Sequence, residues 1–242
     1  MEQVTRPAWP GDISPRFNAR MVGLLSLLTI VTGIFSEGVI NDQLIGRDPA
    51  HVLANIVAHS GQVRLAYVIY MVEMACGVAQ AALFYLVIRP VSRSLAFVAL
   101  CLNLTANILK TGARLFFLAP FLVVAPAPLA TVLDPSTAGT LTFLFLRLND
   151  RAAGMGLVFF GFADIVTGYL LLRATFLPRV FGLISILGGL GWLTYLYQPL
   201  AQSLSAYVIP VGVLGAVAIT LWLLIVGVDE QRWREQAQRS GY

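Results

Sequence analysis

The chain has 242 residues, of which 58% are hydrophobic and 12% charged, and its mean hydropathy is +0.80. Soluble globular domains carry roughly 25% charged residues, so this composition excludes them and indicates a membrane protein with several spanning segments. The net charge of +4 does not indicate a nucleic-acid partner, because the arginines stand in short clusters at the ends of apolar segments.

Six apolar segments are long enough to cross about 30 Å of hydrocarbon as α-helices. We therefore predict an all-α fold in which residues 21–228 form a polytopic membrane helical bundle with six transmembrane helices. Residues 1–20 and 229–242 are expected to be a cytoplasmic N-terminal segment and a cytoplasmic C-terminal tail. The predicted spans are residues 21–40, 65–88, 95–119, 152–172, 177–197 and 206–228.

The arginines that flank the spans predict the orientation of the bundle. They precede the first span, fill the short connections after the second and fourth spans, and follow the last one. Because Lys and Arg are retained on the cytoplasmic side, and six spans return the chain to the side where it began, both termini are predicted to be cytoplasmic. The arginines concerned are Arg6, Arg16, Arg20, Arg89, Arg93, Arg173, Arg179, Arg232, Arg234 and Arg239.

Two of the outer loops are expected to contain short interfacial helices. In the first loop, Asp48 and Pro49 are favourable starting residues for a helix that reaches about Ser60. In the second, the apolar run 140–148 is too short to span the bilayer. It is a re-entrant helix, an interfacial helix, which we favour, or an outward extension of the fourth span. The tail after Val228 is expected to continue the last helix into the cytoplasm.

Four amide or charged side chains recur at helical spacing along the predicted third span. They are Asn103, Asn107, Lys110 and Arg114, separated by four, three and four residues. This spacing places all of them on one side of an α-helix. Lys110 is also the only lysine in the chain. Charged groups within a bilayer almost always face the interior of a bundle, so this side is predicted to point toward neighbouring helices.

Glu73 on the second span is the predicted partner of Lys110. Each of the two residues lies about 13–15 Å from the expected outer end of its helix, so antiparallel neighbours would bring them to one level. Arg114, one turn farther out, is predicted to join Glu73 or to reach Glu37 near the outer end of the first span.

Small residues form a stripe along the predicted fourth span. They are Gly154, Gly161 and Gly168. Their spacing of seven residues predicts close packing against another helix. Asp164 lies on the same stripe, about 13 Å from the inner end of its helix, which is also the depth of Gln80 on the second span. We therefore predict that this carboxyl group meets Gln80, Asn103 or Asn107 rather than lipid.

Two interpretations of these polar side chains are open. In the first, they line a ligand cavity or a proton path, because charged groups within a membrane commonly mark such routes. In the second, two acids and two bases, whose charges sum to zero, only fix how the helices pack. The candidate binding or proton-relay residues are Glu73, Gln80, Asn103, Asn107, Lys110, Arg114 and Asp164.

Several motifs resemble those of a known family. They are ARMVGLL at 19–25, GIFSE at 33–37, RPVSRSL at 89–95, GLVFFG at 156–161, GYLL at 168–171 and FLPR at 176–179. With these motifs the chain resembles, over nearly its whole length, the bacterial membrane family catalogued as domain of unknown function 4386. The resemblance implies a multi-pass protein of the bacterial cytoplasmic (inner) membrane, and it supplies no activity.

Our leading hypothesis is an accessory or ligand-holding subunit that binds a lipid, a quinone, a pigment, a partner membrane protein or a second copy of itself. The alternative is a small proton-coupled transporter that uses Glu73, Lys110 and Asp164, and an enzyme acting on a lipid-soluble substrate comes third. The sequence identifies no cofactor. We also expect no metal site, because His51 and His59 lack a carboxylate that would complete a ligand set.

Overall fold

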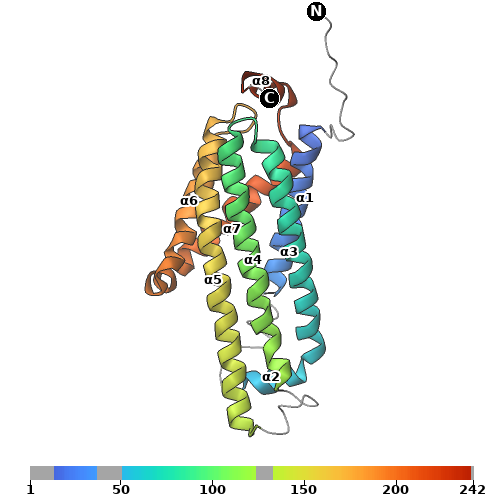
Figure 1. Ribbon diagram of the computed structural model, residues 1–242, viewed down its shortest axis with the longest axis vertical. Helices are drawn as coiled ribbons and strands as arrows, with labels where there is room; N and C mark the ends of the chain where they lie inside the picture. Colours follow the sequence, from blue (N-terminus) through green and yellow to red (C-terminus); the bar gives the residue numbers. More distant parts are fainter. Residues whose placement is uncertain (1–13, 37–50, 124–132, 241–242) are drawn as a thin grey trace, which may run out of the picture.

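The computed structural model describes residues 14–36, 51–123 and 133–240. Within these ranges every regular element is a helix, which confirms the predicted all-α fold (Figure 1). The α-helices are α1 (Pro15–Ile34), α2 (Val52–Ala58), α3 (Ser60–Ile88), α4 (Arg93–Leu118), α5 (Pro135–Arg173), α6 (Val180–Leu193), α7 (Gln198–Ile225) and α8 (Glu230–Arg239). Two short 3₁₀ helices, η2 (Ala119–Leu122) and η4 (Thr194–Leu196), extend α4 and α6.

Among the described residues, five helical segments are long and apolar enough to cross a membrane, namely α1, α3, α4 with η2, α5 and α7. The chain is therefore a multi-pass membrane protein. Large apolar side chains such as Ile108, Leu115 and Leu214 are exposed on the bundle surface, where they contact the lipid bilayer.

The predicted fifth span, residues 177–197, is shorter than expected. α6 and η4 together cover Val180–Leu196, about 27 Å at their rise per residue, before α7 returns (Figure 1). The helix starts late because Leu177 precedes Pro178, a position that disfavours helical backbone. At the other end Tyr197 is extended, where the chain turns into α7. The prediction of six full spans thus holds for five helical segments, and α6 follows only part of the length of α5.

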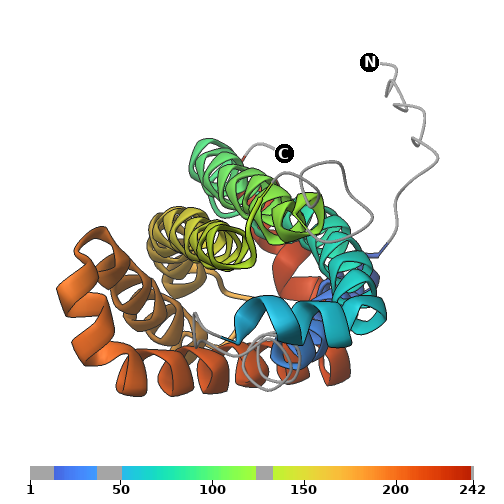
Figure 2. The ribbon, with the colours of Figure 1, turned by 90° about the horizontal axis from the view of Figure 1, so that it is seen from below.

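The long helices α3, α4 and α5 form a row, with α1 beside α3 and α6 beside α5 (Figure 1 and Figure 2). α7 crosses obliquely from η4 to α1 and closes one side of the bundle (Figure 2). The start of α1 meets the end of α7, where Arg20 donates from Nη2 to the carbonyl oxygen of Ile225 over 3.2 Å. We call this the inner end. Both ends of the membrane domain lie at the inner end, as expected. That the inner end faces the cytoplasm stays a prediction.

α5 is one uninterrupted helix of 39 residues. It starts where the Asp134 side chain accepts hydrogen bonds from the backbone N–H groups of Ser136 and Thr137, with Pro135 in the first turn. No further proline interrupts the helix, so the run 140–148 continues directly into the fourth span. The interfacial helix that we favoured is therefore wrong, and the alternative of an outward extension is correct.

The outer part of α5 projects beyond the membrane. Counted from Arg173 at the inner end, about 20 residues of α5 cross the hydrocarbon, which leaves roughly the first half outside it. This half packs with α2 and with the outer ends of α3 and α4, and we call the assembly the outer cap (Figure 1). α2 lies within the short helix predicted in the first outer loop, whereas its predicted starting residues, Asp48 and Pro49, lie outside the described residues. The buried apolar core of the cap consists of Val52, Ile56, Val63, Ala66, Tyr70 and Phe117.

The tail does not continue the last helix as predicted. α7 ends shortly before Gly227, whose φ of +77° is a left-handed conformation that turns the chain. α8 then lies across the inner end, where Trp233 donates from Nε1 to the carbonyl oxygen of Val87 over 2.8 Å. The N–H of Thr175 donates to Gln236 Oε1 over 2.9 Å. These two contacts fix α8 to the ends of α3 and α5.

Candidate functional site

The predicted contact between Glu73 on α3 and Lys110 on α4 is confirmed. Lys110 Nζ lies 3.2 Å from Glu73 Oε1, and the two side chains are 19% and 7% exposed. Glycines of two other helices adjoin the pair. A Cβ added to Gly33 of α1 would lie 3.8 Å from Glu73 Oε1, and one added to Gly156 of α5 would lie 2.8 Å from Lys110 Cγ. The two opposite charges are thus enclosed by four helices.

Arg114 lies one turn farther out, next to the core of the outer cap, and is 2% exposed. Its Nη1 donates to Asn149 Oδ1 on α5 over 3.1 Å, and its guanidinium carbon lies 3.6 Å from the centre of the Tyr70 ring. The predicted contact between Arg114 and Glu73 does not form within the described residues. Glu73 Oε1 binds Lys110, and Glu73 Oε2 is buried without a hydrogen-bond partner. Glu37, the other predicted partner, lies outside the described residues.

The polar side chains lie at two levels of the membrane. Distances along the helices can be measured from the arginines at the inner ends. Glu73 lies about 25 Å from Arg89, and Lys110 lies about 25 Å from Arg93. Gln80, Asn103 and Asp164 lie only about 14 Å away on the same scale. The candidate residues therefore do not form one acid–base cluster. The depth of a side chain in the membrane cannot be measured from the outer end of its helix, because the outer ends belong to the outer cap and lie beyond the hydrocarbon.

A cavity of about 240 Å³ lies at the 14 Å level, between α1, α3, α4, α5, α6 and α7. Asp164, Gln80 and Asn103 all line this cavity, which confirms that these side chains come together. Asn107 does not line it. Instead its Nδ2 donates to Asn103 Oδ1 over 3.0 Å, and its side chain packs against Gly77 of α3. The remaining polar or aromatic residues of the wall are Ser26, Thr29, Phe84, Thr167, Ser185, Trp192 and Thr220.

Asp164 is the only charged residue among the described residues that line this cavity. Within the described part of the chain, its carboxylate makes no hydrogen bond and no ion pair. The carboxylate of Glu73 differs in having a partner, because its Oε1 binds Lys110, although its Oε2 is buried without a hydrogen-bond partner in the described part of the chain. An ionisable group within a membrane is costly unless it has a partner, so the cavity offers an unsatisfied acceptor of hydrogen bonds.

A family model described as Domain of unknown function (DUF4386) matches residues 21–227. The chain belongs to the DUF4386 family. The matched residues run from the first turns of α1 to the glycine that ends α7, so they include every residue of the cavity wall. No curated protein and no solved structure matches the chain. For this DUF4386 protein, the function must therefore be argued from the geometry of the bundle.

The glycine stripe of the DUF4386 chain packs against α6 and η4, as a stripe of small residues predicts. A Cβ on Gly161 would lie 2.8 Å from the carbonyl oxygen of Gly189, and one on Gly168 would lie 2.6 Å from that of Gly182. At Gly154 the nearest contact is the ring of Tyr195, at 3.4 Å from an added Cβ. The contact surface on α6 was missed by sequence analysis, although its two glycines are also seven residues apart.

Sequence analysis also missed the hydroxyl groups of the cavity wall in this DUF4386 protein. Ser26 on α1, Ser185 on α6 and Thr220 on α7 are all buried, and each lines the cavity beside apolar neighbours. A single serine or threonine in an apolar helix gives no directional signal, because its hydroxyl can bond within its own helix. Only the packing of α7 against α1 brings these three residues to one place.

Proposed function

We propose that this protein is a ligand-holding membrane protein, and that it binds a small lipid-soluble molecule in the Asp164 cavity. The observation that carries the proposal is the Asp164 carboxylate, which lines the cavity without a partner in the described part of the chain. A ligand group that donates hydrogen bonds, such as an amine or a hydroxyl, would supply the missing partner.

The remaining wall of the cavity supports a ligand with both polar and apolar parts. Gln80 and Asn103 provide amide groups, which can donate as well as accept hydrogen bonds. Phe84 on α3 and Trp192 on α6 provide aromatic surface. Mostly apolar walls with a few convergent polar groups are typical of small-molecule sites. A hydroxylated ring or an amine with an apolar tail, as in some lipids, quinols and pigments, fits this wall better than an anion does.

The proposal is tested by Asp164→Asn, which keeps the shape of the side chain and removes its charge. Lipid-soluble molecules that co-purify with the protein in detergent are extracted and measured by mass spectrometry against protein concentration. One molecule should be enriched with the wild type and reduced about tenfold or more with D164N, because a hydrogen bond to a charged group is lost.

Glu235→Gln is the matched control, since Glu235 is an exposed carboxylate on α8, outside the cavity. It should retain the co-purified molecule at the wild-type level. Equal amounts of every extracted molecule in the wild type and in D164N would contradict the proposal.

A proton-coupled transporter is the second candidate, and the same residue favours it. An unpaired carboxylate near the middle of a bundle is the kind of group that proton relays use. Glu73 and Lys110 support this candidate less, because they bind each other about 10 Å from the level of Asp164. The two functions differ in whether a solute moves across the membrane. A transporter reconstituted in vesicles would move a solute in response to a pH gradient and would lose this flux in D164N, whereas a ligand-holding protein would show none.

A further inference from the structure

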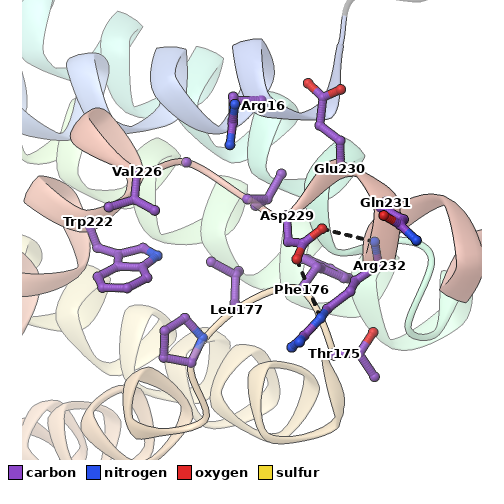
Figure 3. A pocket seen from close by; sticks show the side chains of 13 residues that line it. Arg16, Thr175, Phe176, Leu177, Trp222, Val226, Asp229, Glu230, Gln231 and Arg232 are labelled. Carbon is purple, nitrogen blue, oxygen red and sulfur yellow. Dashed lines mark hydrogen bonds and ion pairs between the residues drawn. The ribbon is translucent and has the colours of Figure 1, made fainter.

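A second pocket of about 680 Å³ lies at the inner end and shares no lining residue with the Asp164 cavity. Its wall is built from the start of α1, the connection between α5 and α6, the end of α7 and the first turn of α8. Figure 3 shows Arg16, Trp222 and Arg232 around this pocket, with Leu177 between them. We call it the inner pocket.

Gly227 is the residue that brings the parts of the inner pocket together. Its φ of +77° turns the chain from α7 toward α8. A Cβ at this position would lie 3.0 Å from Arg16 Cγ, so the absence of a side chain lets the stem of Arg16 pass close to the turn. Arg16, which is exposed, thus lines the pocket from the start of α1.

Two donors of the wall are open to a ligand, because no described residue binds them. Among the described residues, Arg16 has no hydrogen bond and no ion pair, and the indole N–H of Trp222 has no acceptor. The Trp222 ring itself is fixed by Phe181, with ring centres 5.6 Å apart. A cation and an N–H group on one wall favour an anion that accepts several hydrogen bonds.

The carboxylates of the wall do not cancel this preference. Asp229 Oδ2 lies 3.4 Å from Arg232 Nε, and Asp229 also caps the first turn of α8 (Figure 3). Glu230 lies 3.9 Å from Arg234, and Figure 3 shows its carboxylate turned away from Leu177. Each acid is thus matched by a base of its own helix, and the positive charge of Arg16 is left over.

The wall also contains the polar residues Thr175 and Gln231, and its apolar part lies at the boundary of the membrane. Phe176, Leu177, Val226 and Val228 line the pocket together with Pro178. These residues adjoin the inner ends of α5 and α7, where the hydrocarbon gives way to the headgroup region. Tryptophan is enriched at this depth, and basic pockets between helices bind anionic headgroups.

We infer that the inner pocket binds one anionic phospholipid. Its phosphate accepts hydrogen bonds from Arg16 and from the indole N–H of Trp222, and the start of its acyl chains lies along Leu177 and Val226. A free phosphate ion would meet the same two donors without using the apolar wall. The lipid is therefore the ligand to which both halves of the pocket are complementary.

The experiment is native mass spectrometry of the full-length protein in detergent, titrated with phosphatidylglycerol. The expected result is one tightly retained lipid. Arg16→Gln should weaken its binding about fivefold, the effect of one basic residue near a membrane surface. Trp222→Phe, which keeps the ring beside Phe181, should weaken binding by a smaller factor. Arg93→Gln is the control, because Arg93 is exposed at the inner end but does not line the pocket.

Each outcome decides the inference. Equal losses of phosphatidylglycerol binding in R16Q and R93Q would show a diffuse effect of surface charge and would overturn the inference. Unchanged binding in R16Q and W222F would also overturn the inference. Phosphatidylcholine with the same acyl chains should be retained less well, and equal retention would overturn the anionic specificity. Displacement of the lipid by millimolar inorganic phosphate would show an ion site instead of a lipid site. If R16Q fails to fold, W222F and the comparison of lipids still give a decision.

Discussion

Glu73 and Lys110 show what a single buried ion pair does in this bundle. Removal of one partner leaves an uncompensated charge between helices, which destabilises a fold more than the pair itself stabilises it. We expect Glu73→Gln to lower the free energy of unfolding by roughly 3 kcal/mol. Thermal unfolding in detergent measures the effect.

The double variant E73Q/K110Q distinguishes the interaction between the two charges from the effect of each single substitution. Because it contains neither charge, it should be more stable than E73Q alone. Together with K110Q and the wild type it completes a double-mutant cycle, which gives the coupling energy of the two residues. If E73Q unfolded at the temperature of the wild type, the two charges would not be interacting in the membrane.

Asp134 acts outside the membrane, at the start of α5. Hydrogen bonds from the hydroxyl groups of Ser136 and Thr137, and from their backbone N–H groups, hold the pKa of this carboxyl well below its usual range. A folded-state pKa below the unfolded value of about 3.9 stabilises the folded helix start above that pH. The stabilisation is lost as the pH falls below about 4, because the unfolded chain then binds the proton first.

Hydrogen exchange of the first turn of α5 tests this pH dependence. Its protection, relative to the intrinsic exchange rate, should decrease from about pH 5 to about pH 3. The first turn of α1 is the internal control, because Ser14 caps it through a hydroxyl group that does not titrate in this range. Asp134→Ala should reduce protection at every pH. A constant protection in the wild type would exclude the carboxylate as the stabilising group.

At the scale of helices, the contact of α5 with α6 depends on glycines that allow their backbones to approach. A Cβ on Gly168 would lie 2.6 Å from the carbonyl oxygen of Gly182, which belongs to a backbone and cannot move aside. Gly168→Ala is therefore expected to destabilise the protein by about 1–3 kcal/mol through overpacking. Gly112→Ala is the matched control, because an added Cβ there meets nothing within 4 Å.

Gly112→Ala should be neutral or slightly stabilising, since alanine is the better helix former. Thermal unfolding of the two variants in the same detergent gives the comparison. Similar unfolding temperatures for G168A and G112A would mean that α6 can move away from α5 without cost.

The bounds of the helices show which element-level signals were reliable. Asp134 and Pro135 start α5, but local composition favoured a break after residue 148 that the structure does not contain. α6 begins only after Pro178, which shortens the predicted span. The turn at Gly227 was missed, because a glycine at the end of an apolar run does not reveal its φ until the tail packs on the inner end. Long apolar runs identify helices, while their ends depend on contacts with other elements.

At the scale of the molecule, the outer cap changes how depth in the membrane is measured. The ends of α3 and α5 beyond the bilayer carry their own apolar core, so the outer arginines do not mark the edge of the hydrocarbon. Counted from the inner end, Asp164 lies near the middle of the membrane, and the pair of Glu73 and Lys110 lies toward its outer side. This separation makes Asp164 the centre of the proposed ligand site, whereas Glu73 does not line that cavity.

The sequence by itself determined the membrane class, the family, five of the long helices and the contact between Glu73 and Lys110. The membrane class and the helices follow from apolar length, and the polar side of the third span follows from the period of 3.6 residues. The family follows from the sequence motifs. Only the tertiary structure decided that Asp164 faces a cavity, that hydroxyl groups of α1, α6 and α7 complete its wall, and that Arg16 joins a pocket under α8. These sites are made by residues far apart in the chain, and local periodicity does not specify which helices become neighbours.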